Sequence, residues 1–198
     1  MNEQKVQLLD QNTANQIAAG EVVEKPASVV KELVENSLDA GADNIEVTIF
    51  GGGTEYIRVV DNGSGMSEEN AKLAVLRHAT SKIRVAEDLL HLNTLGFRGE
   101  ALPSIASVSN FQLLTRPVTE EFATSIKIEG GDQAECIATG GHTGTTIIVE
   151  NLFLPYSALT VSTKSPLPGV LKTSLSLLTS LNRTSGRDKA NFVINSLI

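Results

Sequence analysis

Hydrophobic and polar positions recur with two different periods along the first 150 residues. Between residues 26 and 40, apolar side chains return every three to four positions, which is typical of an amphipathic helix. Pro26 suits the first turn of this helix and Gly41 suits its end. The opposite side is rich in carboxylate and amide side chains. The pattern therefore predicts a helix with one buried face and one polar face.

Strand-like patterns follow this helix. Residues 45–50 alternate, residues 56–60 are rich in β-forming side chains, and residues 51–54 (Gly-Gly-Gly-Thr) form a hairpin connection. Helices followed by a run of antiparallel strands predict an α+β two-layer sandwich with the helices on one face of the sheet. The further predicted strands are 109–116, 123–129, 134–138 and 145–150. The further predicted helices are 68–76, 86–92 and 99–107.

Composition narrows the functional class. The chain has 198 residues, one cysteine and a formal net charge of −7. One cysteine excludes a disulfide framework and a four-thiolate metal site. No apolar stretch reaches the ~18 residues that a membrane-spanning helix needs, and the polar N-terminus lacks a signal-peptide layout, so we expect a cytoplasmic protein without membrane contact. The acidic balance argues against strong autonomous DNA binding, which needs clustered lysine and arginine.

The charge is unevenly distributed along the chain. Residues 1–153 hold 22 acidic and 11 basic side chains, whereas residues 154–198 hold 1 acidic and 5 basic. This change predicts a boundary near Phe153. We expect one domain over 1–153 and a tail over 154–198 that is poorly ordered or weakly helical.

A glycine-containing loop, Asp-Asn-Gly-Ser-Gly-Met, ends the strand predicted over 56–60. Its carboxylate, Asp61, accepts hydrogen bonds and donates none, so it could recognise an exocyclic amino group such as that of adenine and repel the oxygen of guanine. Gly63 and Gly65 allow positive φ and close backbone approach to a flat ligand. The alternative interpretation is a polar turn, which this pattern alone more often indicates.

The polar helix face carries Glu32 and Asn36, which are one turn apart. A glutamate there could orient and deprotonate a water molecule. The asparagine oxygen could bind Mg²⁺, a hard cation that prefers oxygen ligands. The alternative is an ordinary solvated helix face. Asparagine is a poor residue for a helix interior, so its place at position 36 favours function.

Two further segments could hold phosphates. Residues 96–102 (Gly-Phe-Arg-Gly-Glu-Ala-Leu) lead into a predicted helix whose free N–H groups could bind a polyphosphate. Thr80, Ser81 and Lys82 supply donors from a loop that could fold over the same phosphates. The alternative is a helix-capping loop and an exposed connector. The P-loop and dinucleotide-binding patterns are absent from the sequence, and its three histidines lack metal-ligand spacing.

These stretches together resemble one known family. Residues 13–41, 61–66, 77–83, 95–107 and 144–146 are similar, in order and spacing, to the N-terminal ATPase domain of the MutL family of DNA mismatch repair proteins. That domain belongs to a superfamily shared with gyrase B subunits, histidine kinases and certain chaperones. The resemblance implies a Bergerat-type ATP-binding fold with a mixed, mostly antiparallel sheet. It also implies ATP and Mg²⁺ as cofactors and slow ATP hydrolysis.

The resemblance assigns roles to the residues selected above. Glu32 matches the general base, Asn36 the Mg²⁺ ligand and Asp61 the carboxylate that reads the adenine amino group. The other positions that match the nucleotide-binding part of the family are Gly63, Gly65, Met66, Thr80, Ser81, Lys82, Gly96, Phe97, Arg98, Gly99, Glu100, Ala101, Leu102 and Thr145.

The resemblance also implies partners. In the family, ATP closes a lid and brings two N-terminal domains together, so it implies an ATP-dependent homodimer. The implied partners are a mismatch-recognition protein and a downstream nuclease or helicase, with DNA bound weakly at best by this acidic chain.

The family pattern stops at Leu154, where a segment leading to a second domain is expected. In the family that second domain supplies a lysine to the ATP γ-phosphate. We interpret residues 154–198 as a divergent or out-of-frame tail. Two functions stay open, a weakly active MutL-type ATPase and a truncated, non-catalytic nucleotide- or partner-binding fragment.

Overall fold

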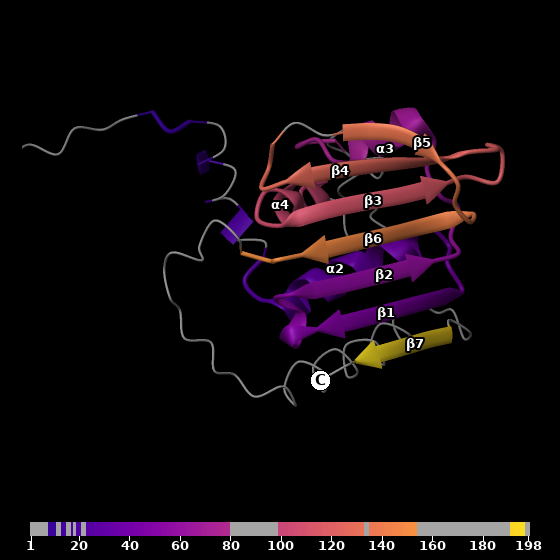
Figure 1. Ribbon diagram of the computed structural model, residues 1–198, viewed down its shortest axis with the longest axis horizontal. Coiled ribbons are helices and arrows are strands. Elements are labelled where there is room, and N and C mark those ends of the chain that lie inside the picture. Colours follow the sequence, from indigo (N-terminus) through magenta and orange to yellow (C-terminus); the bar gives the residue numbers. More distant parts are fainter. Residues whose placement is uncertain are drawn as a thin grey trace, which may run out of the picture.

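A seven-stranded sheet in the order β5-β4-β3-β6-β2-β1-β7 forms the centre of the molecule (Figure 1). The computed structural model describes residues 8–10, 13–14, 17, 19–20, 23–79, 99–132, 135–153 and 191–196. Neighbouring strands are antiparallel, except for β1 and β7, which run parallel. The predicted mixed, mostly antiparallel sheet is therefore confirmed. The strands are β1 (Asn44–Phe50), β2 (Tyr56–Asp61), β3 (Asn110–Arg116), β4 (Ala123–Glu129), β5 (Glu135–Thr139), β6 (Gly144–Glu150) and β7 (Asn191–Ser196).

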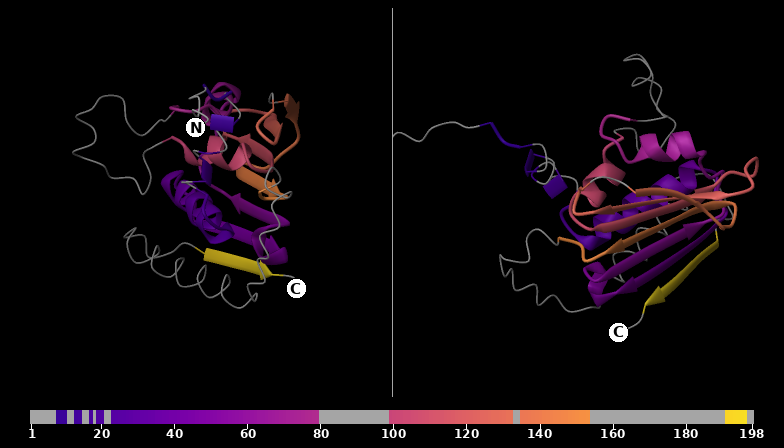
Figure 2. Two further views of the ribbon diagram at one scale, coloured as in Figure 1. Left: turned by 90° about the vertical axis from the view of Figure 1, so that its left-hand side faces the viewer. Right: turned by 45° about the horizontal axis from the view of Figure 1, so that its top comes forward.

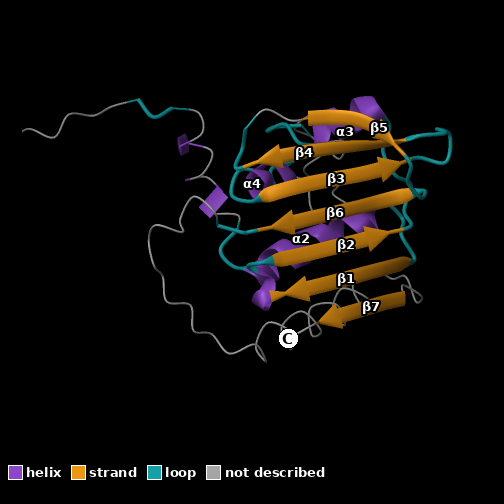
Figure 3. Cartoon of the chain, in the orientation of Figure 1, coloured by secondary structure: helices purple, strands orange, loops and turns teal. Residues whose placement is uncertain are grey.

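The helices pack on one face of this sheet, behind the strands in Figure 3. Helix α2 (Pro26–Asp39) packs on β1 and β2, α4 (Ala101–Ala106) on β3, and α3 (Glu68–Ala74) against β4. A short 3₁₀ turn, η1 (Gly51–Gly53), joins β1 to β2. The predicted two-layer arrangement is confirmed. In the described part of the chain, no helix is long and apolar enough to cross a membrane.

Helix α2 forms because its sequence supplies both ends and one apolar face. Pro26 occupies the first turn, where its missing N–H costs nothing. Gly41 has φ of 81° and donates its N–H to the carbonyl of Leu38 at 3.0 Å, which ends the helix. The buried positions recur every three or four residues and face the sheet, as the periodicity predicts.

The inward-facing side chains of the central strands stack in rows. Strand pairing aligns one residue from each of β2, β6 and β3, and each aligned set is buried under the helices. Burying such side chains contributes about 1.5–3 kcal/mol each. Two apolar rows are Ile57–Val149–Phe111 and Val59–Ile147–Leu113.

The tail contributes an edge strand. β7 lies beside β1, in yellow in Figure 2, and begins with a hydrogen bond of 2.8 Å from Asn191 N–H to the carbonyl of Asp43. Phe192 and Ile194 pack against the core. Residues 191–196 thus form a strand, whereas the sequence analysis expects a poorly ordered or weakly helical tail over 154–198. Residues 154–190 and the predicted helix 86–92 lie outside the described residues.

Candidate functional site

The row next to the two apolar rows is polar. Asp61 on β2 pairs with Thr145 on β6, and Thr145 pairs with Thr115 on β3. These residues are 6%, 7% and 1% exposed. Side chains alternate between the two faces of a strand, so residues two positions apart share a face. The polar row therefore lies on the same face of the sheet as the apolar rows, the face that α2 covers. The core thus ends in a line of buried oxygen atoms.

Three donors hold the carboxylate of Asp61. The N–H groups of Gly63 and Thr145 donate to Oδ1 at 2.9 and 3.2 Å, and the hydroxyl of Ser37 lies 2.8 Å from Oδ2. A carboxylate oxygen has two lone pairs, so the two N–H groups use the capacity of Oδ1. Among the described residues, Oδ2 has one donor and keeps a lone pair for another. The residue that the sequence singles out as an amino-group reader is therefore oriented by its surroundings.

Ser37 is a site residue that the sequence analysis did not select. Its hydroxyl reaches both Asp61 Oδ2 and the carbonyl of Leu33, the latter at 3.1 Å. Ser37 is 3% exposed and lies on the apolar side of α2. A polar residue among the apolar positions of an amphipathic helix was the available signal, because a buried hydroxyl needs a partner.

Thr115 and Arg116 form a second group that the sequence analysis missed. The hydroxyl of Thr115 accepts from Met66 N–H at 2.9 Å and lies 3.0 Å from that of Thr145. The guanidinium of Arg116 donates to the carbonyls of Gly141 and Glu120 at 2.8 and 3.0 Å. It also donates to the hydroxyl of Thr143 at 2.8 Å. These contacts fix the loops on both sides of the polar row.

The glycines of the site are required by the protein's own packing. Gly65 has φ of 65°, and a Cβ there would lie 2.2 Å from the carbonyl oxygen of Arg116. Gly144 has φ of 115°, and a Cβ there would lie 2.1 Å from the carbonyl oxygen of Asp61. For Gly65, the sequence predicts close backbone approach to a ligand. The structure shows a further reason for glycine, since other residues would clash with a neighbouring strand or loop.

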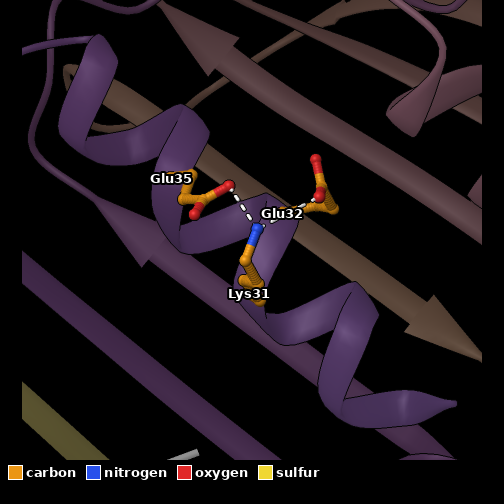
Figure 4. Close-up of polar contacts among 3 residues, drawn as sticks. All are labelled: Lys31, Glu32 and Glu35. Atoms are coloured by element: carbon orange, nitrogen blue, oxygen red, sulfur yellow. Dashed lines mark hydrogen bonds and ion pairs between the residues drawn. The ribbon is translucent and has the colours of Figure 1, made fainter. Parts of the chain in front are cut away.

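The polar face of α2 carries a lysine between two glutamates (Figure 4). Lys31 Nζ lies 2.8 Å from Glu35 Oε2 and 3.5 Å from Glu32 Oε1. Burial alone would lower the pKa of Lys31, but the hydrogen bond to Glu35 and the charges of both glutamates raise it above its ordinary 10.5. The side chain of Glu35 is 7% exposed and that of Glu32 is 33% exposed. The buried glutamate thus holds the lysine, and Glu32 is more open to solvent.

Glu32 and Asn36 lie along the same helix as Ser37. The rise of an α-helix is 1.5 Å per residue, so Glu32 is about 7.5 Å from Ser37 along the axis. Asn36 is half-buried. Over the described residues, no group of three or more histidine, cysteine, aspartate or glutamate side chains could hold a metal ion. A cation at Asn36 would therefore complete its shell with ligand phosphates and water, as Mg²⁺ usually does.

The start of α4 is joined to the segment after α3. Glu100 accepts a hydrogen bond of 3.1 Å from the backbone N–H of His78, lies 2.7 Å from its Nδ1, and lies 3.5 Å from Nη1 of Arg77. The structure therefore places Glu100, in the described part of the candidate segment 96–102, beside Arg77 and His78, which precede the candidate segment 80–82. Gly99, Ala101 and Leu102 are described there. The candidates outside the described residues are Thr80, Ser81, Lys82, Gly96, Phe97 and Arg98.

A family comparison matches this arrangement. The sequence profile of the histidine kinase-, DNA gyrase B- and HSP90-like ATPases matches residues 24–138, which contain α2, β2 and Asp61. The chain belongs to this family.

Curated relatives narrow the assignment within the family. The chain is 57% identical over 148 residues to the DNA mismatch repair protein MutL of Heliobacterium modesticaldum and 59% identical over 152 residues to that of Symbiobacterium thermophilum. These matches cover 75% of this chain but 22% and 24% of the relatives. The chain thus spans about a quarter of the length of these MutL proteins.

Solved structures agree with the sequence relatives. The Aquifex aeolicus MutL ATPase domain complexed with ADP superposes with a TM-score of 0.69 at 31% identity, covering 88% of this chain and 61% of that one. A K252N variant of the same domain gives a TM-score of 0.64 at 30% identity. The matched part of this chain is therefore a MutL-type ATPase domain.

Proposed function

We propose that this chain binds ATP with Mg²⁺ and hydrolyses it slowly as the nucleotide-dependent domain of a mismatch repair protein. The observation that carries this proposal is the buried carboxylate of Asp61, which is fixed by three donors and keeps a lone pair on Oδ2. An exocyclic amino group could donate to that lone pair. The oxygen that guanine presents at the same position would face a carboxylate and be repelled. The site therefore favours adenine.

The hydrolytic part of the proposal rests on α2. Glu32 is partly exposed and could orient and deprotonate an attacking water, while Lys31 is held mainly by Glu35. The oxygen of Asn36 would hold Mg²⁺, which when bound neutralises phosphate charge. Hydrolysis of this kind depends on positioning and electrostatics, with little covalent chemistry for the protein. The segments at 80–82 and 96–102 would contact the phosphates.

The remaining parts of the proposal concern the whole repair protein. We infer lid closure and a homodimer driven by ATP, together with contacts to a mismatch-recognition protein and a downstream nuclease or helicase in the cytoplasm. The support is the similarity to MutL proteins, of which this chain spans about a quarter. A second candidate function is a non-catalytic fragment that binds nucleotide or a partner, because the contacts that orient Asp61 do not involve Glu32 or Asn36.

The first experiment is a thermal melt with Mg²⁺ and a non-hydrolysable analogue of ATP or GTP. A ligand that binds the folded state stabilises it by RT ln(1 + [L]/Kd), which is about 2.7 kcal/mol at a hundredfold excess over Kd. We expect an upward shift with the ATP analogue and a smaller one with the GTP analogue. Equal shifts, or none with the ATP analogue, would count against the proposed base recognition.

A second experiment separates the two candidate functions. Glu32→Ala should remove ATP turnover while leaving the dissociation constant of the analogue within about threefold. The reason is that Glu32 is assigned to activating the attacking water and not to contacting the adenine ring. If the parent chain binds ATP but its turnover equals that of the variant, the non-catalytic function is selected. Equal loss of analogue binding and ATP turnover would count against Glu32 as the general base of hydrolysis.

A further inference from the structure

Thr115 has no role in the family-based assignment, yet its hydroxyl contacts three groups in or beside the polar row. It accepts from Met66 N–H at 2.9 Å, lies 3.2 Å from the carbonyl oxygen of Gly144 and lies 3.0 Å from the hydroxyl of Thr145. Thr115 is 1% exposed, so no bulk water competes for these contacts. Its hydroxyl therefore connects the glycine loop after β2 with the start of β6.

The groups involved fix only some of these directions. A backbone N–H donates and a carbonyl oxygen accepts, whereas a hydroxyl has a single proton to give. Thr115 accepts from Met66, and its own proton can go to the carbonyl of Gly144 or to the hydroxyl of Thr145, because either hydroxyl of that pair can donate. In the arrangement that satisfies the Gly144 carbonyl as well, Thr145 donates to Thr115, and the remaining lone pair of Thr145 is free to accept.

We propose that Thr115 is a positioning residue for base specificity, because it takes the proton of Thr145 and makes that hydroxyl an acceptor toward the nucleotide base. This inference rests on the proposed ATP site. Thr145 is the strand partner of Asp61 and donates its N–H to that carboxylate. The site then presents two acceptors, Asp61 Oδ2 and Thr145 Oγ1, to the edge of the base. An amino group satisfies such a pair, and a 6-oxo group is repelled by both.

The test compares two diphosphates that are not hydrolysed, ADP and inosine diphosphate, by calorimetric titration with Mg²⁺. The parent should bind ADP more tightly. Thr115→Val keeps the shape of the side chain but removes the oxygen that accepts the proton of Thr145. The hydroxyl of Thr145 can then donate to the oxo group of inosine diphosphate. The dissociation constant for inosine diphosphate divided by that for ADP should therefore fall by about three- to tenfold. Thr115→Ser restores the hydroxyl and should keep the parental ratio. Equal weakening of both ligands, or an unchanged or wider ratio in Thr115→Val, would overturn the proposal.

A double-mutant cycle shows whether Thr115 acts through Thr145. Thr145→Val removes the acceptor, so it should narrow the ratio by itself. Adding Thr115→Val to that background should leave the ratio unchanged. A further change in the double variant would mean that Thr115 acts by another route, and the proposal would be wrong. The proposal would also be wrong if Thr145→Val kept the parental ratio of the two dissociation constants.

Hydrogen exchange separates this inference from the proposed function. In the nucleotide-free chain, the Met66 amide should exchange faster in Thr115→Val and at the parental rate in Thr115→Ser, because only the former lacks the acceptor. A parental rate in Thr115→Val would overturn the contact on which the inference depends. If the parent binds neither diphosphate while the Met66 amide behaves as expected, the proposed ATP site fails and the base-specificity role fails with it, although the Thr115 contact stands.

Discussion

The hydroxyl of Ser37 lies 2.8 Å from Oδ2 of Asp61, and this contact joins the middle of α2 to the end of β2. The two residues are 24 positions apart and belong to different motifs of the sequence. Because Asn36 precedes Ser37 and Glu32 lies about one and a half turns before it, the contact also fixes the polar face of the helix relative to the buried carboxylate. One serine therefore links the helix that carries Glu32 and Asn36 to the carboxylate of Asp61.

Removing this hydroxyl should lower the stability of the folded chain. Ser37→Ala leaves Asp61 Oδ2 without its donor, and hydrogen bonds to charged groups contribute about 1.5–3 kcal/mol. We expect a loss of that size in the free energy of unfolding, measured by urea denaturation. Ser28→Ala, on the half-buried first turn of the same helix, is the matched control and should cost less than about 0.5 kcal/mol. Equal losses in the two variants would contradict the importance of the Ser37–Asp61 bond.

Two glycines near the start of β6 should respond differently to alanine. Gly144→Ala places a Cβ 2.1 Å from the carbonyl oxygen of Asp61 in a backbone conformation with φ of 115°, so we expect a loss of at least about 2 kcal/mol. Gly140→Ala meets nothing within 4 Å and should change stability by less than about 0.5 kcal/mol. Chemical denaturation of both variants checks this. A tolerated alanine at position 144 would mean that the β2–β6 junction is looser than the structure shows.

The ion pair on α2 should give stability a defined pH dependence. The folded chain raises the pKa of Lys31 above 10.5, so it holds this proton more tightly than the unfolded chain does. The resulting stabilisation is complete below pH 10.5 and is lost as the pH rises through the folded-state pKa. The difference in Tm between the parent and Lys31→Met should therefore be constant near neutral pH and shrink above pH 10.5.

The Glu35→Gln variant provides the control for that titration. It removes the partner at 2.8 Å, so the alkaline loss of stability should be smaller than in the parent. A Tm difference between the parent and Lys31→Met that stays constant through the alkaline range would show that the lysine contributes by packing rather than by charge.

The edge strand of the tail can be tested with two neighbouring residues. Ile194 packs against the core, whereas Val193 is 48% exposed on the other side of β7. Ile194→Ala should cost about 1–2 kcal/mol and Val193→Ala less than about 0.5 kcal/mol, measured by urea denaturation. If both variants match the parent, residues 191–196 contribute little to the fold and the assignment of the tail as a separate unit gains support.

Local patterns were sufficient for most of the secondary structure. The helix at 26–39 and the strands at 44–50, 56–61 and 123–129 lie within one residue of their predicted bounds. Their periods of 3.6 and 2 are properties of neighbouring residues, so they can be read from the sequence. Asp61 could be selected for a similar reason, since an aspartate that ends a strand before two glycines is a local signal. The strand at 191–196 was missed because it follows a polar stretch and its partner, β1, lies about 150 residues earlier.

Local patterns were enough to identify α2 with its polar face, most of the strands, and Asp61, the carboxylate proposed to read the base. The fold was needed to show that Asp61, Thr145 and Thr115 form one buried row and that Ser37 faces this row from the helix. Strand register and helix docking depend on pairing and packing between residues 24 to 84 positions apart, and no local pattern records contacts at such separations.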